Sequence, residues 1–315
     1  MRHRWVRVVV VCAWVAVAIP LHGQGAPQRS TELFRSGVDL VALDICVKNR
    51  EGRFVPRLDP RDLVVLEDNV PQTIAFVWPA DRIPVAVTLL LDRSSSMEGD
   101  PIKYAREAAM RFVDGLGPDD QLSIIAFGRR AQRLTSFGDD RITASNAILT
   151  AEASGTTALY DAMLVALDDI AKARRTRTRE MRDVVLVLSD GDDTASVNGF
   201  DEVKAAARRS DVLFYAVAIR DRTSLPGLTR NTAPTWPLTT IAAETGGAAV
   251  SAPGFDQLPA VFDGILDEIS HLYRVGYVSS NGRRDGTWRK VAVRVAGSDV
   301  IARTRAGYIA PRGPM

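Results

Sequence analysis

Three short stretches of the sequence combine carboxylates with small hydroxyl side chains. The first, DRSSSM, begins at Asp92 and directly follows the apolar run PVAVTLLL. The second, SGTTALYD, begins at Ser154, and the third, LVLSDGDDT, contains an Asp-Gly pair at Asp190. Carboxylate and hydroxyl oxygens are hard ligands that suit Mg²⁺, Mn²⁺ or Ca²⁺, and these stretches contain no cysteine or histidine to bind zinc or copper. Their residue types indicate hard-cation chemistry if the fold brings them together.

The apolar runs before the first and third stretches are typical of strands that are buried on both faces of a parallel sheet. In an open α/β sheet, ligands gather at the carboxyl ends of the strands, near the point where the strand order reverses. We therefore expect the three polar stretches to meet at one edge of the sheet.

Strand-like runs alternate with segments of helical periodicity from Ile83 to Tyr273. QLSIIAF, DVVLVLSD and DVLFYAVAI follow the first run as predicted strands, and GGAAVSA is a candidate edge strand. YAREAAMRFVDGL, TALYDAMLVALDDIAKAR, DEVKAAARRS and FDQLPAVFDGILDEISHLY have apolar residues at helical spacing, and ITASNAILTAEA is a further predicted helix. This alternation predicts an α/β fold, with a doubly wound, mostly parallel sheet that has helices on both faces.

Both ends of the chain show short alternating β patterns instead. Residues 33–80 contain VDLVALDICVKN, DLVVLED and QTIAFVW, and residues 274–311 contain YRVGYVSS, GTWRKVAVRVA and VIARTRAGYIAP. Because β segments this short are marginal on their own, we expect the two flanks to form one small antiparallel unit. The α/β domain, residues 81–273, would then be inserted between them. Two separate β appendages are the alternative.

Residues 1–25 have the order of a secretory signal peptide, with a basic start, an apolar middle and a small, polar end. An uncleaved membrane anchor is the alternative. Cleavage would remove three arginines and no acid, so the formal charge of +2 would become −1. A nearly neutral chain gives no reason to expect a nucleic-acid partner. We expect an extracytoplasmic product, periplasmic or secreted, with no stable membrane span after cleavage.

Cleavage would leave one histidine, His271, and one cysteine, Cys46. These two residues are too few for a nucleophile-histidine-acid triad, a zinc site of histidines and cysteines, or a disulfide framework. Because Cys46 lies in a strand-like run, we interpret it as a small core hydrophobe. A reactive thiol or an intermolecular bridge is the alternative.

The three polar stretches, in this order and at predicted strand ends, resemble the metal-ion-dependent adhesion site of von Willebrand factor type A domains. The resemblance covers roughly Ile83 to Tyr273, and the β flanks look like those of a bacterial secreted subgroup of these proteins. It implies hydroxyl ligands that contact the ion directly, two carboxylates that act largely through bound water, and Mg²⁺ as the ion, with Mn²⁺ or Ca²⁺ as alternatives. By position, the implied metal residues are Asp92, Ser94, Ser96, Thr157 and Asp190.

The sequence departs from the family pattern without removing a ligand. Arg93 and Ser95 fill positions where the family often has glycine, and Thr156 stands where a second glycine is common. Thr156 could therefore compete with Thr157 for the metal. The alternative for the whole constellation is that these side chains only cap helices and close turns.

The resemblance implies a binding module without enzymatic activity, which engages an acidic residue of a partner protein through the ion. The alternative is a metal-dependent hydrolase that uses the same ion as a Lewis acid, with Asp192 or Asp193 as the general base. The sequence contains no Walker-type phosphate loop and no dinucleotide-binding fingerprint.

Overall fold

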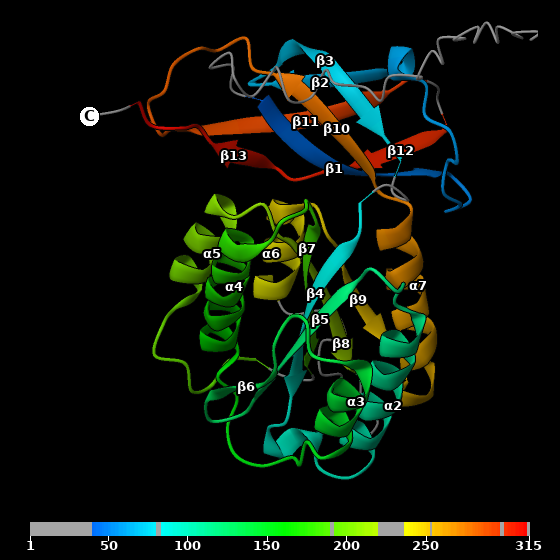
Figure 1. The fold of residues 1–315 in the computed structure, drawn as a ribbon, viewed down its shortest axis with the longest axis vertical. Helices are drawn as coiled ribbons and strands as arrows, with labels where there is room; N and C mark the ends of the chain where they lie inside the picture. Colours follow the sequence, from blue (N-terminus) through cyan, green and yellow to red (C-terminus); the bar gives the residue numbers. More distant parts are fainter. Residues whose placement is uncertain are drawn as a thin grey trace, which may run out of the picture. The chain divides into compact units, whose positions relative to one another are not determined.

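The computed structural model describes residues 40–79, 83–189, 192–219, 236–252, 254–296 and 299–313. Within these ranges the strands form two sheets, one of six strands and one of seven (Figure 1). The predicted signal peptide, residues 1–25, lies outside the described residues. None of the helices in the described ranges combines the length and the apolar character that crossing a membrane requires.

The six-stranded sheet has the order β6-β5-β4-β7-β8-β9 and is parallel except for β6, which runs antiparallel to β5. The strand order reverses at β4, the first strand of the domain, so β4 lies at the switch point of the sheet. The strands are β4 (Val85–Asp92), β5 (Gln121–Phe127), β6 (Ala131–Thr135), β7 (Arg182–Ser189), β8 (Leu213–Ile219) and β9 (Ala249–Ala252).

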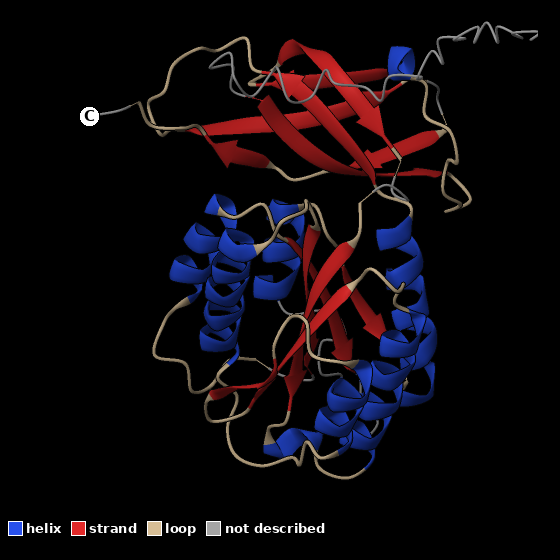
Figure 2. Cartoon of the chain, in the orientation of Figure 1, coloured by secondary structure: helices blue, strands red, loops and turns tan. Residues whose placement is uncertain are grey.

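Helices cover both faces of this sheet (Figure 2). Leu89 and Leu91 of β4 pack into one apolar core and Leu90 packs into the other, which explains the continuous apolar run of a strand buried on both sides. The first core contains residues from α2 (Asp100–Gly115), α3 (Arg141–Leu149) and α7 (Leu258–Ser270). The second contains residues from α4 (Leu159–Thr176), α5 (Phe200–Arg209) and α6 (Trp236–Thr245).

The seven-stranded sheet joins the two flanks of the sequence. Its order is β12-β1-β10-β3-β2-β11-β13, and every pairing is antiparallel. Because β10 lies between β1 and β3, and β11 pairs with β2, neither flank forms a complete sheet alone. The predicted fold class is confirmed. The strands are β1 (Leu40–Asn49), β2 (Leu63–Glu67), β3 (Val70–Trp78), β10 (Tyr273–Val278), β11 (Trp288–Val295), β12 (Val300–Arg303) and β13 (Gly307–Ile309).

Some elements differ from the sequence prediction. Strand β6 and helix α6 were not predicted, α3 ends at Leu149 rather than near residue 153, and the last β run divides into β12 and β13. Strand β6 is a short, half-exposed edge strand with the sequence AQRLT. It has no continuous apolar run from which a buried strand could be predicted. Three short 3₁₀ helices complete the described elements: η1 (Pro60–Asp62), η3 (Ser95–Met97) and η4 (Phe255–Gln257).

Buried charges connect the two sheets. The Arg182 side chain at the start of β7 is 1% exposed, and its Nε donates to the Asp44 carboxylate of β1 at 2.8 Å. Arg274 of β10 donates to the same carboxylate at 3.0 and 3.1 Å. Burial alone would raise the pKa of Asp44, but the two guanidinium groups hold it below its ordinary value of 3.8. Asp44 therefore stays ionised between two cations that come from different segments of the chain.

We predict that Arg182→Met lowers the free energy of unfolding by about 3 kcal/mol at pH 7, because it leaves a buried carboxylate with one cation instead of two. A folded-state pKa below the unfolded value contributes stability that is present above about pH 4 and is lost as the pH falls through the folded pKa. The difference between wild type and variant should therefore shrink when urea unfolding is repeated near pH 2.5.

Arg111→Met provides the control, because it removes an ion pair with Asp263 whose side chains are 61% and 43% exposed. Its effect should stay below about 1 kcal/mol at either pH. Equal effects of the two substitutions at pH 7 would contradict the role assigned to Arg182.

Candidate functional site

The carboxylate of Asp92 ends strand β4 and is completely buried. Its Oδ1 accepts a hydrogen bond from the backbone amide of Ser94 at 2.8 Å. Its Oδ2 accepts from the hydroxyl of Ser189, at the end of β7, at 2.5 Å. Asp92 thus closes the turn that follows its own strand and fixes that turn to the neighbouring strand.

This turn brings two of the predicted ligand hydroxyls together. The Oγ atoms of Ser94 and Ser96 are 3.0 Å apart. The short helix η3 carries this turn, and Met97, which is 0% exposed, anchors it in the core. The Ser94 side chain is buried and Ser96 is exposed, so this pair lies between the core and the surface.

The second polar stretch is joined to the first by two hydrogen bonds between Ser95 and Gly155. The amide of Ser95 donates to the carbonyl of Gly155 at 2.8 Å, and the amide of Gly155 donates to the Ser95 hydroxyl at 2.9 Å. Gly155 has a φ of +82°, which favours glycine at this position. The hydroxyl of Ser95 is therefore used within the protein, which agrees with its assignment to a position that is not a ligand.

Burial distinguishes the two adjacent threonines of this stretch. Thr157 is 5% exposed, whereas Thr156 is exposed. The amide of Thr157 donates to the Thr194 hydroxyl at 3.0 Å, and its carbonyl accepts from the amides of Thr194 and Ala195. Thr157 thus joins the second polar stretch to the loop after β7, and its assignment as the ligand in preference to Thr156 stays a prediction.

Gly128, at the end of β5, lets these loops approach one another. A Cβ at this position would lie 3.0 Å from the carbonyl oxygen of Ser154 and 3.5 Å from those of Arg93 and Thr156. The carbonyl of Gly128 accepts from the amide of Ala158 at 2.7 Å. The sequence analysis missed this glycine, whose only signal was its place directly after a predicted strand.

The loop after β7 is held by two carboxylates that the sequence analysis did not assign to this task. Asp193 accepts from the Tyr160 amide at 3.1 Å and from the Ser196 hydroxyl at 2.5 Å. Asp161 accepts from the amides of Val197 and Asn198 at 3.0 and 3.1 Å. Burial alone would raise the pKa of Asp161, but these hydrogen bonds hold it below its ordinary value. The loop is therefore tied at two places to the first turn of α4.

Four of the five predicted metal residues can be placed. Asp92, Ser94 and Ser96 come from the end of β4, and Thr157 comes from the loop joined to it. The predicted ligand Asp190 lies outside the described residues, although Ser189 immediately before it contacts Asp92. The described members of the set thus lie in two loops that are bonded to each other at the carboxyl edge of the sheet.

The donors and their spacing fit a small, hard cation. An octahedral ion with bonds of 2.0–2.1 Å, as Mg²⁺ has, requires neighbouring ligand oxygens about 2.9 Å apart. The hydroxyls of Ser94 and Ser96, at 3.0 Å, already have this separation, which is also that of a hydrogen bond. The longer bonds of Ca²⁺ would require roughly 3.3–3.7 Å in the same geometry. This one separation is compatible with Mg²⁺ or Mn²⁺.

His271 and Cys46 are the histidine and the cysteine that lie in the described ranges. Cys46 is 4% exposed, and burial, aided by the nearby Glu268 carboxylate, raises the pKa of its thiol to about 11. A protonated, buried thiol is a poor nucleophile, which agrees with its interpretation as a core residue. His271 follows α7, and its ring stacks on Phe54 at a centroid distance of 4.7 Å.

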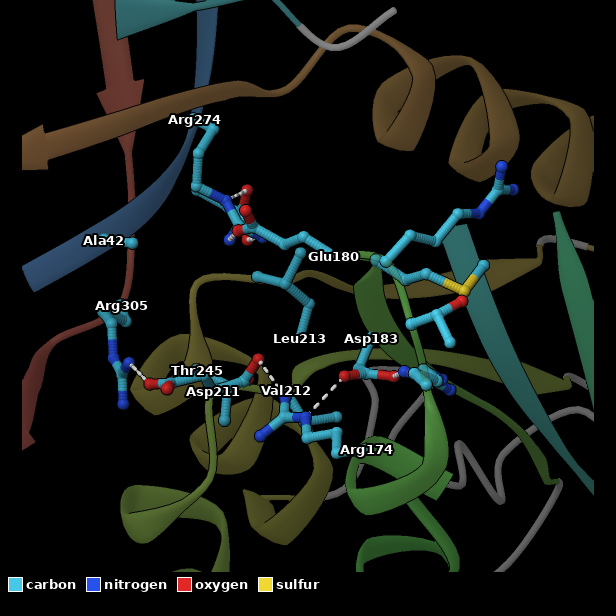
Figure 3. A pocket seen from close by; sticks show the side chains of 15 residues that line it. Ala42, Arg174, Glu180, Asp183, Asp211, Val212, Leu213, Thr245, Arg274 and Arg305 are labelled. Carbon is cyan, nitrogen blue, oxygen red and sulfur yellow. Dashed lines mark hydrogen bonds and ion pairs between the residues drawn. The ribbon is translucent and has the colours of Figure 1, made fainter. Parts of the chain in front are cut away.

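A cavity of about 520 Å³ lies elsewhere, at the amino end of β7 (Figure 3). Most of its charged side chains pair with one another. Asp183 binds Arg174 and Arg177, Asp44 binds Arg274, and Arg305 binds the Asp211 carboxylate. These pairings identify its lining as part of the charged network that joins the two sheets.

A model of the von Willebrand factor type A domain matches residues 86–264, which is more than half of the chain. The chain belongs to this family. It is 33% identical over 113 residues to the sll0103 protein of Synechocystis, a match that covers 35% of this chain and 26% of that protein. It is 30% identical over 139 residues to the inter-alpha-trypsin inhibitor heavy chain H4 of Sus scrofa, covering 42% of this chain and 15% of that protein.

The chain thus matches about a quarter of the cyanobacterial relative and a smaller part of the pig relative.

A solved structure of von Willebrand factor type A from Catenulispora acidiphila has a TM-score of 0.51 and 12% identity, and the match covers 88% of this chain and 75% of that one. At this identity the likeness shows the fold alone. The part of this chain that the solved structure covers extends beyond residues 86–264.

We predict that Gly128→Ala lowers the free energy of unfolding by about 1–3 kcal/mol, because the added Cβ would lie 3.0 Å from the backbone carbonyl oxygen of Ser154, closer than an ordinary van der Waals contact. Gly264→Ala is the control. Gly264 lies inside α7 with nothing within 4 Å of an added Cβ, so alanine there should stabilise the protein by roughly 0.5–1 kcal/mol. Chemical denaturation measures both, and a Gly128→Ala variant as stable as wild type would show that the three loops are not closely packed.

Proposed function

We propose that this chain is an extracytoplasmic interaction module that binds an acidic side chain of a partner protein through a divalent cation. The ion is Mg²⁺, held by Asp92, Ser94, Ser96, Thr157 and Asp190. When bound, the ion supplies an electrophilic centre that attracts a carboxylate from the partner. The observation that carries the proposal is the 3.0 Å spacing of the Ser94 and Ser96 hydroxyls beside the buried Asp92 carboxylate.

The side chains have separate tasks in this proposal. The hydroxyls of Ser94, Ser96 and Thr157 are neutral ligands, so they leave most of the charge of the ion uncompensated. The carboxylate of Asp92 holds the turn that carries Ser94 and Ser96 by accepting a hydrogen bond from the Ser94 amide. A weakly neutralised ion in a pre-organised setting favours an additional anionic ligand, and this supports binding of a partner carboxylate.

A binding role fits the site better than hydrolysis. A hydrolase would need a general base close to the ion, and the sequence offered Asp192 and Asp193. Both oxygens of Asp193 accept hydrogen bonds, from the Tyr160 amide and from the Ser196 hydroxyl and amide. Asp192 is exposed. We therefore propose that the site is not enzymatic, and that Asp193 holds the loop instead of activating water.

The extracytoplasmic location rests on the signal-like pattern of residues 1–25. Cys46, the cysteine that would remain after cleavage, is buried and unpaired, so the described fold uses no disulfide. Intact-mass measurement on the native protein tests the location. A mature chain that begins near residue 26 supports export, and retention of Arg2, Arg4 and Arg7 would contradict a cleaved signal.

We predict that millimolar Mg²⁺ raises the melting temperature of the wild-type protein, because an ion that binds only the folded state stabilises it by mass action. The gain is about 2.7 kcal/mol at a concentration one hundred times the Kd. Thr157→Val, which keeps the shape but removes the hydroxyl ligand, should abolish most of the rise. Asp92→Asn should do the same.

Thr156→Val and Ser95→Ala are the matched controls, since each removes a neighbouring hydroxyl. Ser95→Ala should lower the starting melting temperature, because the Gly155 amide loses its acceptor, but both controls should keep the metal response. Equal responses in all four variants would mean that the hydroxyls act only in caps and turns. Mg²⁺-dependent phosphoesterase or peptidase activity that is lost in Asp193→Asn would instead support the hydrolase.

A further inference from the structure

Three arginines gather on one side of the proposed metal site. Arg129 and Arg130 form the tight turn between β5 and β6 and are both exposed. Arg93 directly follows Asp92, and its amide donates to the carbonyl of Phe127 at 2.7 Å. Its guanidinium donates to the side chain of Gln132 on β6 at 2.7 Å, which directs it toward the same turn. All three cations therefore lie at the carboxyl edge of the sheet, on the β5 side of Asp92.

The turn that carries these arginines is in contact with the ligand loops. A Cβ on Gly155 would lie 3.7 Å from the Cβ of Arg129. Gly155 is bonded to Ser95 and lies two residues before Thr157. The base of the Arg129 side chain is therefore one residue away from the site, well within the reach of a long, flexible cation.

Within the part of the chain that the structure describes, these three guanidinium groups have no carboxylate partner. In the described ranges, no carboxylate forms an ion pair with Arg93, Arg129 or Arg130. Glu152, three residues before Gly155, is exposed and pairs with none of them. By contrast, arginines at the amino edge, such as Arg174, Arg274 and Arg305, are paired with acids.

The opposite side of the site carries the opposite charge. β4 lies between β5 and β7, so the loop after β7 faces the arginine turn across Asp92. The first two described residues of that loop are Asp192 and Asp193, and Asp192 is exposed. A ligand with more than one acid would be attracted on the β5 side and repelled on the β7 side.

We infer that the partner segment carries a second acidic residue next to the one that binds the ion, and that Arg93, Arg129 and Arg130 contact it. This inference rests on the proposed function. It specifies the ligand as a segment with two or more acids, bound so that the second acid lies on the β5 side of the ion. An extended peptide advances roughly 3.3 Å per residue, so the two acids should be separated by no more than about four residues.

Selection from a random twelve-residue peptide library tests this inference without a known partner. The immobilised protein is loaded with Mg²⁺, and bound peptides are released with EDTA. Wild type should yield peptides with two acids at short spacing. Arg129→Gln/Arg130→Gln should yield peptides in which the second acid is no longer enriched.

Arg175→Gln/Arg209→Gln is the matched control. Both arginines are exposed and lie in the last turns of α4 and α5, where no ion pair forms with a described carboxylate, and the change in net charge is identical. This control should select the same peptides as wild type. The Arg129/Arg130 variant should bind a selected two-acid peptide about three- to tenfold more weakly than wild type at low salt. This difference in affinity should become smaller as NaCl screens the attraction between the arginines and the peptide.

The outcomes of the peptide selection distinguish a failure of this inference from a failure of the proposed function. EDTA-released peptides with a single acid and no second enriched acid would overturn the arginine contact and leave the metal-dependent binding intact. The same selection by the Arg129/Arg130 variant and by wild type would also overturn it. If EDTA releases no acidic peptide from wild type, the proposed function itself is wrong.

Discussion

The buried carboxylate of Asp92 is the constraint on which the site depends. A charge at the end of a fully buried strand is unfavourable unless its oxygens have partners. The Ser94 amide and the Ser189 hydroxyl supply such partners, one from the turn after β4 and one from the end of β7. Satisfying this carboxylate therefore sets the path of the chain beyond β4 and positions the two serine hydroxyls that face the proposed ion.

The described parts of the surrounding loops are bonded to one another as well as to the sheet. Gly155 exchanges hydrogen bonds with Ser95, and Gly128 allows close approach where any larger residue would meet carbonyl oxygens. Asp161 and Asp193 tie the loop after β7 to α4. A site made of weak, neutral ligands benefits from such pre-organisation, since little binding energy is then used to order the loops.

Much of this could be predicted from the sequence, for physical reasons that differ between elements. The continuous apolar runs before Asp92 and Asp190 are typical of strands buried on both faces of a parallel sheet. The polar residues that follow such strands are expected at the same edge of the sheet. The sequence predicted that the two β flanks combine into one unit, because short β segments are marginal alone. It did not predict that β10 lies between β1 and β3. The sequence pattern assigned the ligand position to Thr157, with Thr156 as a competitor, but it could not predict that Thr157 is buried and Thr156 exposed. The tasks of Asp193 and Gly128 were missed, because their contacts join residues about 26 to 33 positions apart.

The most direct test of the account is a crystal structure of the protein soaked in Mn²⁺ and measured for anomalous scattering. The account predicts a single strong peak at the carboxyl edge of the parallel sheet, about 2.1–2.2 Å from the hydroxyl oxygens of Ser94, Ser96 and Thr157. Well-ordered density for these three side chains, without a metal peak between them at saturating Mn²⁺, would contradict it.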